Sequence, residues 1–478
     1  MHQKTNFVKS ILLIALLQFL NLFLLESTLN LILTIPQIVF VLILIFKGDL
    51  NSAILWHIVF ILTAVDVNTK DEELEMLSYP AVKLIGPLTI SYILLGLIWL
   101  KSLRYKVRVS ECSLFYKLRQ LFLILLLSGS VLGACGIIFL DYNYRDFISP
   151  CRYMLVAVLT IDIFARLYNK SLMQRCCNTA ICLLIVSPIV SLLSFGLFNI
   201  SYTYSVFVSF ITNSIFILTP SMLLFLMFKF DKNLKTLMIF SLLCLFILTT
   251  TAARGSQYIT IATSFLLMVY MVYFTKEKEN LSGLAIFRVI VPLLGFAAFT
   301  YGGILLLNVG NSLAANKLNQ FVSLFTVFSG GKGFSIDQVS TSPYVRIAEV
   351  LNIVDNGLHN PLGLIFGQGY GSYYTDSLHL FYIVDLSNGG FGDEAIASGK
   401  FATAHSMYPN ALLFHGIIGF YFIVKLGIQY LKRIYFTPLI FAAFVLLLYS
   451  LYYNVSLMIA CIMFLFASEC KIKYNKII

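Results

Sequence analysis

Apolar residues form long runs that recur almost without pause along the chain. A helix needs about 20 apolar residues to cross the roughly 30 Å hydrocarbon core of a bilayer. The pattern predicts spans at residues 10–26, 29–46, 50–65, 81–100, 120–140, 150–168, 176–197, 206–228, 236–253, 256–275, 285–307, 406–424, 437–452 and 455–469. The last two predicted spans are short, and one re-entrant unit is the alternative to two separate spans. We therefore expect an all-α, polytopic transmembrane helical bundle of about 12–14 spans.

Composition and charge support a membrane protein. Of the 478 residues, 59% are hydrophobic and 12% charged, whereas soluble domains carry about 25% charged residues. Most Lys and Arg residues fall on one side if the spans alternate from a cytoplasmic amino terminus, as the positive-inside rule requires. The net charge of +11 is therefore an orientation signal, and we exclude nucleic acid as a partner.

One long connection divides the chain. Residues 1–307 hold the amino-terminal transmembrane helices, residues 308–402 form a large external loop, and residues 403–478 hold the carboxy-terminal helices. A loop of this length inside a compact protein is usually functional. Candidate functional residues are therefore expected in the loop and in the spans that meet it.

The loop contains a predicted short helix with a signal at each end. Ser342 suits the N-cap, Pro343 the first helical position and Gly357 the residue just past the end. Arg346 then lies in the first turn, where unpaired N–H groups and a guanidinium together favour phosphate. The alternative is a surface ion pair between Arg346 and Glu349 at i, i+3, worth about 0.2–0.5 kcal/mol.

Three glycines at alternate positions follow this helix: Gly367, Gly369 and Gly371. The strand before and the helix after a dinucleotide-binding fingerprint are missing, which argues against a Rossmann site. A flexible turn would let the backbone approach a ligand closely. A plain loop turn remains the alternative.

A histidine opens the span that follows the loop. His405 precedes Tyr408 and Pro409, and a proline suits the first turn of a helix. Its imidazole can accept a proton near neutral pH, although an interfacial side chain is the alternative. His415 lies about 15 Å further along the helix, so the two histidines cannot share a metal ion. We predict neither a metal site nor a cofactor.

Arg254 stands at the external junction between two spans, where the positive-inside bias disfavours arginine. Charged residues at such depths usually face a functional cavity, although a snorkelling anchor is the alternative. Arg254, Arg346 and His405 all map to the same membrane face, and we predict that they converge on one site.

Other polar residues in the spans are predicted to have structural roles. His57 and the i, i+4 pair of Asp162 and Arg166 are left out of the site. The acidic stretch from Asp66 to Glu75 would be an alternative source of a carboxylate base, but a run of charges is usually a solvated face.

Over residues 245–425, these features resemble the family of O-antigen polymerases (Wzy) and O-antigen ligases, which are bacterial inner-membrane glycosyltransferases. The matching motifs are Arg254-Gly255, Arg346 on a short loop helix, Gly367 to Gly371, His405 at the start of a span, and Gly416-Ile417-Ile418-Gly419. Ser406 and Pro409 stand where the family commonly has Asn and Leu.

The resemblance implies a GT-C-like bundle in the inner membrane, with both termini cytoplasmic and the large loop, which contains short helices, in the periplasm. It implies metal-independent transfer of glycan from an undecaprenyl-pyrophosphate carrier. His405 would be the general base, and Arg346 and Arg254 would stabilise the pyrophosphate. Substrate-binding roles would fall to Gly367, Gly369, Gly371, Tyr408 and Glu349. Implied partners are the lipid-linked oligosaccharide, membrane lipid and a chain-length regulator protein.

The motifs are degenerate, which favours a polymerase that joins lipid-linked repeat units. The sibling alternative is a ligase that moves the glycan to lipid A core. A flippase is the alternative from another class, and it would require repeated halves and charges lining the spans. The chain shows no such repeat.

Overall fold

The computed structural model describes residues 2–24, 30–66, 78–85, 88–111, 113–198, 204–205, 236–237, 240–241, 244, 341–381, 391–405, 407–431, 443–444, 447, 450–452 and 455–469. They are mostly helical, as the sequence predicts.

Nine helices coincide with predicted spans: α1 (His2–Phe23), α2 (Asn30–Lys47), α3 (Leu50–Thr63), α5 (Ile90–Ser102), α6 (Leu114–Phe139), α7 (Tyr144–Arg166), α8 (Lys170–Phe198), α18 (Met407–Leu431) and α20 (Val455–Ser468). Five of them, α2, α6, α7, α8 and α18, are long and apolar enough to cross a membrane. The predicted spans at 206–228, 236–253, 256–275, 285–307 and 437–452 lie wholly or mostly outside the described residues.

Short strands interrupt the helical pattern at two places. Strands β2 (Lys83–Ile85) and β3 (Leu88–Thr89) pair antiparallel and occupy the first half of the span predicted at 81–100. That span is wrong at its start, because an apolar run also suits paired strands and helical period alone does not separate the two. Strands β1 (Val65–Asp66) and β4 (Tyr204–Ser205) also pair antiparallel.

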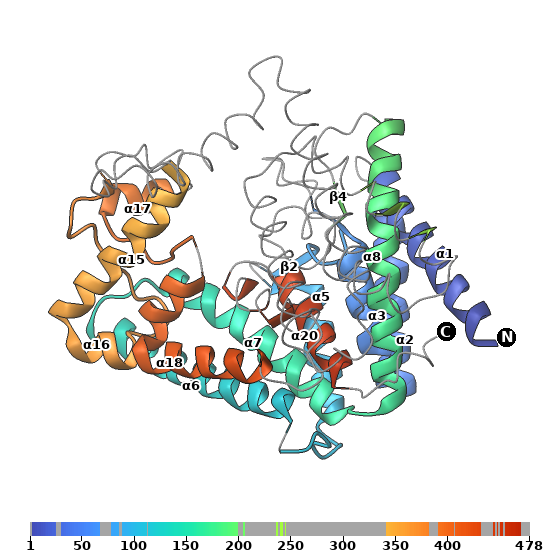
Figure 1. The fold of residues 1–478 in the computed structure, drawn as a ribbon, viewed down its shortest axis with the longest axis horizontal. Helices are drawn as coiled ribbons and strands as arrows, with labels where there is room; N and C mark the ends of the chain where they lie inside the picture. The colour runs from blue at the N-terminus through green and yellow to red at the C-terminus, as the bar shows by residue number, and fades with distance from the viewer. Residues whose placement is uncertain are drawn as a thin grey trace, which may run out of the picture.

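The helices form two neighbouring groups (Figure 1). In one group α6 packs between α7 and α18, and the loop helices α15 (Thr341–His359), α16 (Pro361–Phe366) and α17 (Asp393–Ser398) gather near the end where α6 meets α7. In the other, α8 packs on α1 and α3. Helix α20 contacts α3, α7 and α8 and is buried almost throughout, as expected of a helix that is apolar on every side.

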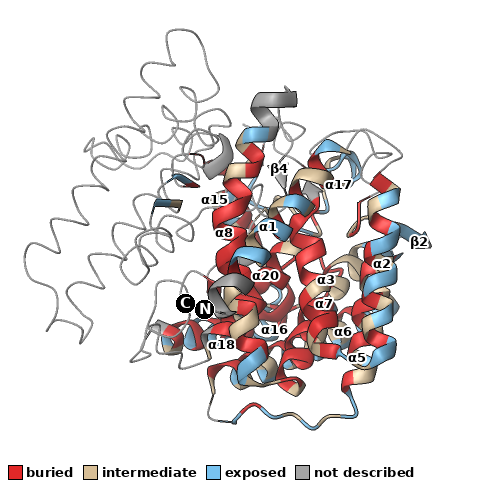
Figure 2. Ribbon diagram, turned by 90° about the vertical axis from the view of Figure 1, so that its right-hand side faces the viewer, coloured by how far each residue is buried: buried red, intermediate tan, exposed pale blue. Residues whose placement is uncertain are grey.

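The outward faces of several helices are apolar. Figure 2 shows buried residues turned inward and exposed ones along α2, α5 and α6, and the exposed side chains include Ile32, Ile35 and Phe46 on α2 and Ile124, Leu127 and Val131 on α6. A soluble protein rarely leaves an apolar surface of this size uncovered. The pattern is that of a bundle surrounded by lipid.

A buried carboxylate joins α5, α6 and α7 at the end of the bundle opposite the loop helices. Asp162 accepts hydrogen bonds from Arg166 Nε at 2.7 Å, Arg119 Nε at 2.7 Å and Trp99 Nε1 at 2.8 Å. The predicted structural pair of Asp162 and Arg166 is therefore confirmed. His57, which was also predicted to be structural, lies buried in α3 with Nδ1 2.9 Å from the Tyr79 hydroxyl.

Candidate functional site

Helix α15 confirms the predicted short loop helix, but its ends differ from the prediction. It begins at Thr341, before the predicted N-cap Ser342, so Arg346 lies in the second turn, and it ends at His359, three residues beyond the predicted last residue. Gly357 lies inside the helix, so its predicted place past the end is wrong. A Cβ on Gly357 would lie 2.7 Å from Leu364 Cδ1 of α16, which shows that the glycine permits close packing of the two helices. Asn360 and Pro361 then end α15 and begin α16, with the Asn360 side chain accepting from Gly363 N.

Glu349 lies on the buried face of α15. Its neighbours on that face, Tyr344, Val345 and Ala348, are apolar or aromatic, yet Glu349 has an exposed fraction of 0%. A buried carboxylate needs compensating hydrogen bonds or an opposite charge. The surface ion pair with Arg346 is therefore wrong, because Glu349 points into the protein, where its partner is His405.

Two groups of His405 converge on the Glu349 carboxylate. The backbone N–H of His405 donates to both oxygens at 3.1 Å, and Nδ1 lies 2.6 Å from Oε1. An ionised carboxylate only accepts hydrogen bonds, so Nδ1 must carry the proton it donates. This leaves the lone pair on the other ring nitrogen, Nε2, to accept a proton from elsewhere.

Tyr374 completes the set of donors to Glu349. Its hydroxyl donates to Oε1 at 3.3 Å, and its backbone pairs with Phe401 a few residues before His405. Burial, followed by the neighbouring Glu349 carboxylate, raises the pKa of Tyr374 well above its ordinary value. The hydroxyl therefore stays protonated and remains a donor.

The His405 ring is buried on one side only. Its side chain is 29% exposed, whereas that of Glu349 is fully buried. The Phe391 ring packs edge-on against the imidazole with ring centroids 4.7 Å apart, and Phe391 in turn packs on Phe401. The arrangement is a partly exposed imidazole resting on a buried carboxylate.

Asn410 fixes the chain just before His405. Its side-chain amide accepts from Ala404 N and donates to Ala404 O, both at 2.8 Å, and Asn410 itself is 4% exposed. A side chain that bonds both backbone groups of one residue restrains that residue's position and rotation. Asn410 on α18 and Glu349 on α15 thus hold the His405 segment from two helices.

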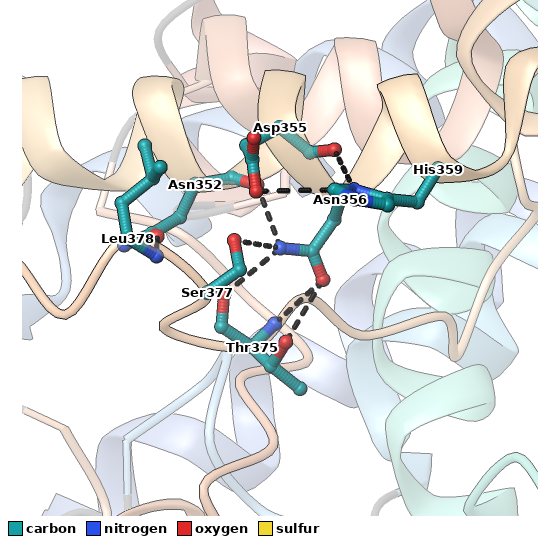
Figure 3. A network of polar contacts seen from close by, with 7 residues as sticks. All are labelled: Asn352, Asp355, Asn356, His359, Thr375, Ser377 and Leu378. Carbon is teal, nitrogen blue, oxygen red and sulfur yellow. Dashed lines mark hydrogen bonds and ion pairs between the residues drawn. The ribbon is translucent and has the colours of Figure 1, made fainter.

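A second polar network ties the loop to α15 (Figure 3). The Asn356 amide nitrogen donates to Thr375 O and Ser377 Oγ, and its oxygen accepts from Thr375 N at 3.1 Å. One turn earlier, Asn352 accepts from Leu378 N. These contacts hold the segment that follows Tyr374 against α15, so the hydroxyl stays beside Glu349.

Arg346 lies one turn before Glu349 on the exposed side of α15. Within the part of the chain that the structure describes, no carboxylate pairs with its guanidinium. Arg346 is one turn from Glu349 along α15, but among the described residues no hydrogen bond or ion pair joins it to Glu349 or His405. Arg254, the third predicted member, lies outside the described residues, so the convergence of all three stays a prediction.

Among the described residues, the other predicted substrate-binding residues form no hydrogen bond with Glu349 or His405. Tyr408 is 48% exposed and packs against the Phe420 ring with centroids 6.3 Å apart. Gly367, Gly369 and Gly371 have φ values of 89°, 82° and 83° and lie against the protein's own helices. The close backbone approach that these glycines allow is therefore to α6, α7 and α18.

His415 is the second histidine of α18, and its surroundings differ from those of His405. It is 3% exposed, its Nε2 faces the Tyr452 hydroxyl, and its ring packs against Tyr370. Among the described residues, no three His, Cys, Asp or Glu side chains gather in a group that could hold a metal ion.

The pairing of Glu349 with His405 was not predicted, because Glu349 was assigned to substrate. The available signal was a glutamate on the apolar face of a predicted helix, which requires a buried partner.

Compared with models of protein families, with curated proteins and with solved structures, the chain has no match in any of the three.

Proposed function

We propose that this protein is a membrane glycosyltransferase that extends a glycan by transfer from an undecaprenyl-pyrophosphate carrier to a sugar hydroxyl on a second lipid-linked repeat unit, without a metal ion. The observation that carries the proposal is the His405 imidazole, held at Nδ1 by buried Glu349 and partly exposed at its outer side. Such an imidazole suits a general base.

In the proposed step, Nε2 of His405 accepts the proton of the acceptor hydroxyl while the hydroxyl oxygen attacks the anomeric carbon of the donor. The bond between that carbon and the pyrophosphate oxygen breaks, and the carrier leaves as undecaprenyl pyrophosphate. The imidazolium that forms is stabilised by the Glu349 carboxylate 2.6 Å away. A positioned base of this kind contributes about 10² to 10⁴ in rate.

Arg346 would stabilise the charge that develops on the leaving pyrophosphate. A guanidinium is permanently charged and matches phosphate oxygens with two parallel donors. Arg346 lies on the exposed side of α15, so its guanidinium is accessible to a ligand. Arg254 has the same proposed role.

Deletion of the gene tests the reaction class. We expect lipopolysaccharide with side chains of a single repeat unit. Side chains that are absent, with glycan accumulating on its carrier, would indicate the ligase instead. Repeat units trapped in the cytoplasm would indicate a flippase.

Point variants test the site. We expect His405→Ala and Arg346→Ala each to abolish chain extension while the protein remains in the membrane. His359→Ala and Arg145→Ala are matched controls, because His359 is an exposed histidine on α15 and Arg145 an exposed arginine at the start of α7, and both should extend chains normally. Long chains made by either site variant would remove that residue from the mechanism.

A further inference from the structure

The glycine turn after α16 is inserted between two long helices. Gln368 N donates to Leu413 O at 2.9 Å, and Gly369 N donates to Phe414 O at 3.1 Å, both on α18. Tyr370 N donates to Gly129 O of α6 at 2.9 Å. Three consecutive backbone N–H groups of the loop are therefore satisfied by carbonyls of apolar helices.

Helix α18 is broken where it receives the turn. Gly416 has φ 63° and ψ −170°, so the helix kinks there. A kink deprives carbonyls of the preceding turn of their regular helical partners. Leu413 and Phe414 lie in that turn and accept from the loop instead. The kink and the inserted turn thus satisfy each other's backbone groups.

Glycines make the approach possible on both sides. A Cβ on Gly369 would lie 2.2 Å from Gly133 N of α6, and one on Gly133 would lie 2.3 Å from Tyr370 O. On the other side, a Cβ on Gly416 would lie 2.4 Å from Gly367 N. No side chain fits at these positions, so backbone packs directly on backbone.

The insertion is deep relative to the helices. Gly416 lies about 14 Å along α18 from its start at Met407, and Gly129 lies about 15 Å along α6 from its end at Phe139, at 1.5 Å per residue. His405 stands just before the start of α18. The loop therefore descends well past the level of His405 before it returns.

Helix α16 leads into this turn and shows an apolar outer side. Its sequence PLGLIF contains no charge, and Leu362, Ile365 and Phe366 are 70%, 41% and 54% exposed. It packs on α18. Beside the kink, Ile417 and Ile418 of α18 are also exposed, so the apolar side of α16 continues the outward apolar surface of α18.

We propose that residues 361–371 form a re-entrant element, and that the apolar side of α16 lies in the acyl chains of the leaflet nearer His405. Irregular backbone occurs at membrane depth only where protein satisfies its polar groups, and the three hydrogen bonds to α6 and α18 meet that condition. Hydrocarbon is the occupant that fits an uncharged surface continuous with lipid-facing helix residues. The inference does not depend on the proposed function.

Fluorescence quenching in vesicles tests this placement. Leu362→Cys and Phe366→Cys are each labelled with bimane in a Cys135→Ser background, because Cys135 is exposed, and the unsubstituted background supplies the correction. Ala397→Cys on α17 is the matched control, since α17 is an exposed loop helix of the same length that begins with two acidic residues. The full chain is reconstituted into phosphatidylcholine and phosphatidylglycerol vesicles.

We expect lipids brominated on the acyl chain to quench the labels at 362 and 366 several-fold more than aqueous iodide does. At 397, we expect iodide to quench the label more than the brominated lipids do. Both substituted side chains are exposed, so folding is preserved whichever environment surrounds them. Iodide quenching at 362 and 366 equal to or greater than bromolipid quenching would overturn the proposal. Because the readout is independent of turnover, an inactive protein with the expected quenching pattern would leave this inference standing.

Discussion

Glu349 and Asp162 are both buried carboxylates saturated by hydrogen bonds, but their partners differ. Asp162 is held by two arginines and a tryptophan from α5, α6 and α7. Glu349 is held by an imidazole, a backbone N–H and a tyrosine hydroxyl. Arginine and tryptophan do not exchange protons near neutral pH, whereas histidine does. The same arrangement therefore gives cohesion at one end of the bundle and a candidate base at the other.

Exposure separates the two clusters further. The arginines beside Asp162 have side chains only 17% exposed, and one of them also donates to the Tyr105 carbonyl. His405 is 29% exposed and keeps one ring nitrogen for an external partner. A carboxylate alone thus does not identify a reactive site. A reactive site is identified by the group that the carboxylate orients and by whether substrate can reach that group.

The largest expected effect is on activity, from Glu349→Gln. The amide is nearly isosteric but cannot stabilise an imidazolium, so chain extension should fall by about 10² to 10⁴-fold. The measurement is turnover of purified protein on lipid-linked repeat units as a function of pH. A purely structural role would leave the shape of the pH profile unchanged, whereas a role through His405 alters it. Asp162→Asn is the comparison. The fraction of this variant that remains folded should show the same pH profile of turnover as the unsubstituted protein.

The next effect is on stability, from Asp162→Ala. Removal of this carboxylate leaves Arg119 and Arg166 without their shared partner inside the bundle. Breaking a buried ion pair in this way costs about 3–5 kcal/mol. Thermal unfolding in detergent should show a clear drop in midpoint, with Glu111→Ala, an exposed acidic residue, as the control. An unchanged midpoint would contradict the cohesive role of Asp162.

Periodicity and end signals predicted the parts of this fold that depend on local sequence. The positions of nine spans, the helix that carries Arg346 and the i, i+4 pair at Asp162 follow from spacing within one element. The strands at residues 83–89 did not follow, because their pairing partner rather than their hydrophobicity makes them strands.

The candidate site was predicted by residue and not by contact. His405 stood out as an imidazole at the start of a predicted span, and Arg346 as a guanidinium near the start of a predicted loop helix. The contact between Glu349 and His405 joins residues 56 positions apart, and the hydrogen bond from Tyr374 to Glu349 joins residues 25 positions apart. Such contacts depend on tertiary packing, which a single sequence does not encode in any local period.

The smallest effects come from removing a single donor at each carboxylate. Tyr374→Phe deletes the 3.3 Å hydrogen bond to Glu349, and Trp99→Phe deletes the 2.8 Å hydrogen bond to Asp162. The loss of one hydrogen bond costs about 0.5–1.5 kcal/mol, and Trp99→Phe adds a packing loss because the smaller ring leaves space. Both variants should therefore unfold at slightly lower temperature.

Only Tyr374→Phe should also lower turnover, by about tenfold or less, because Glu349 would hold His405 less firmly while Asp162 holds no catalytic group. Tyr373→Phe is the control for the first variant, since its ring lies against Tyr142 and Lys400 rather than against Glu349. Equal loss of turnover in Tyr374→Phe and Trp99→Phe would show that turnover follows stability alone. In that case the functional difference between the two carboxylates would not hold.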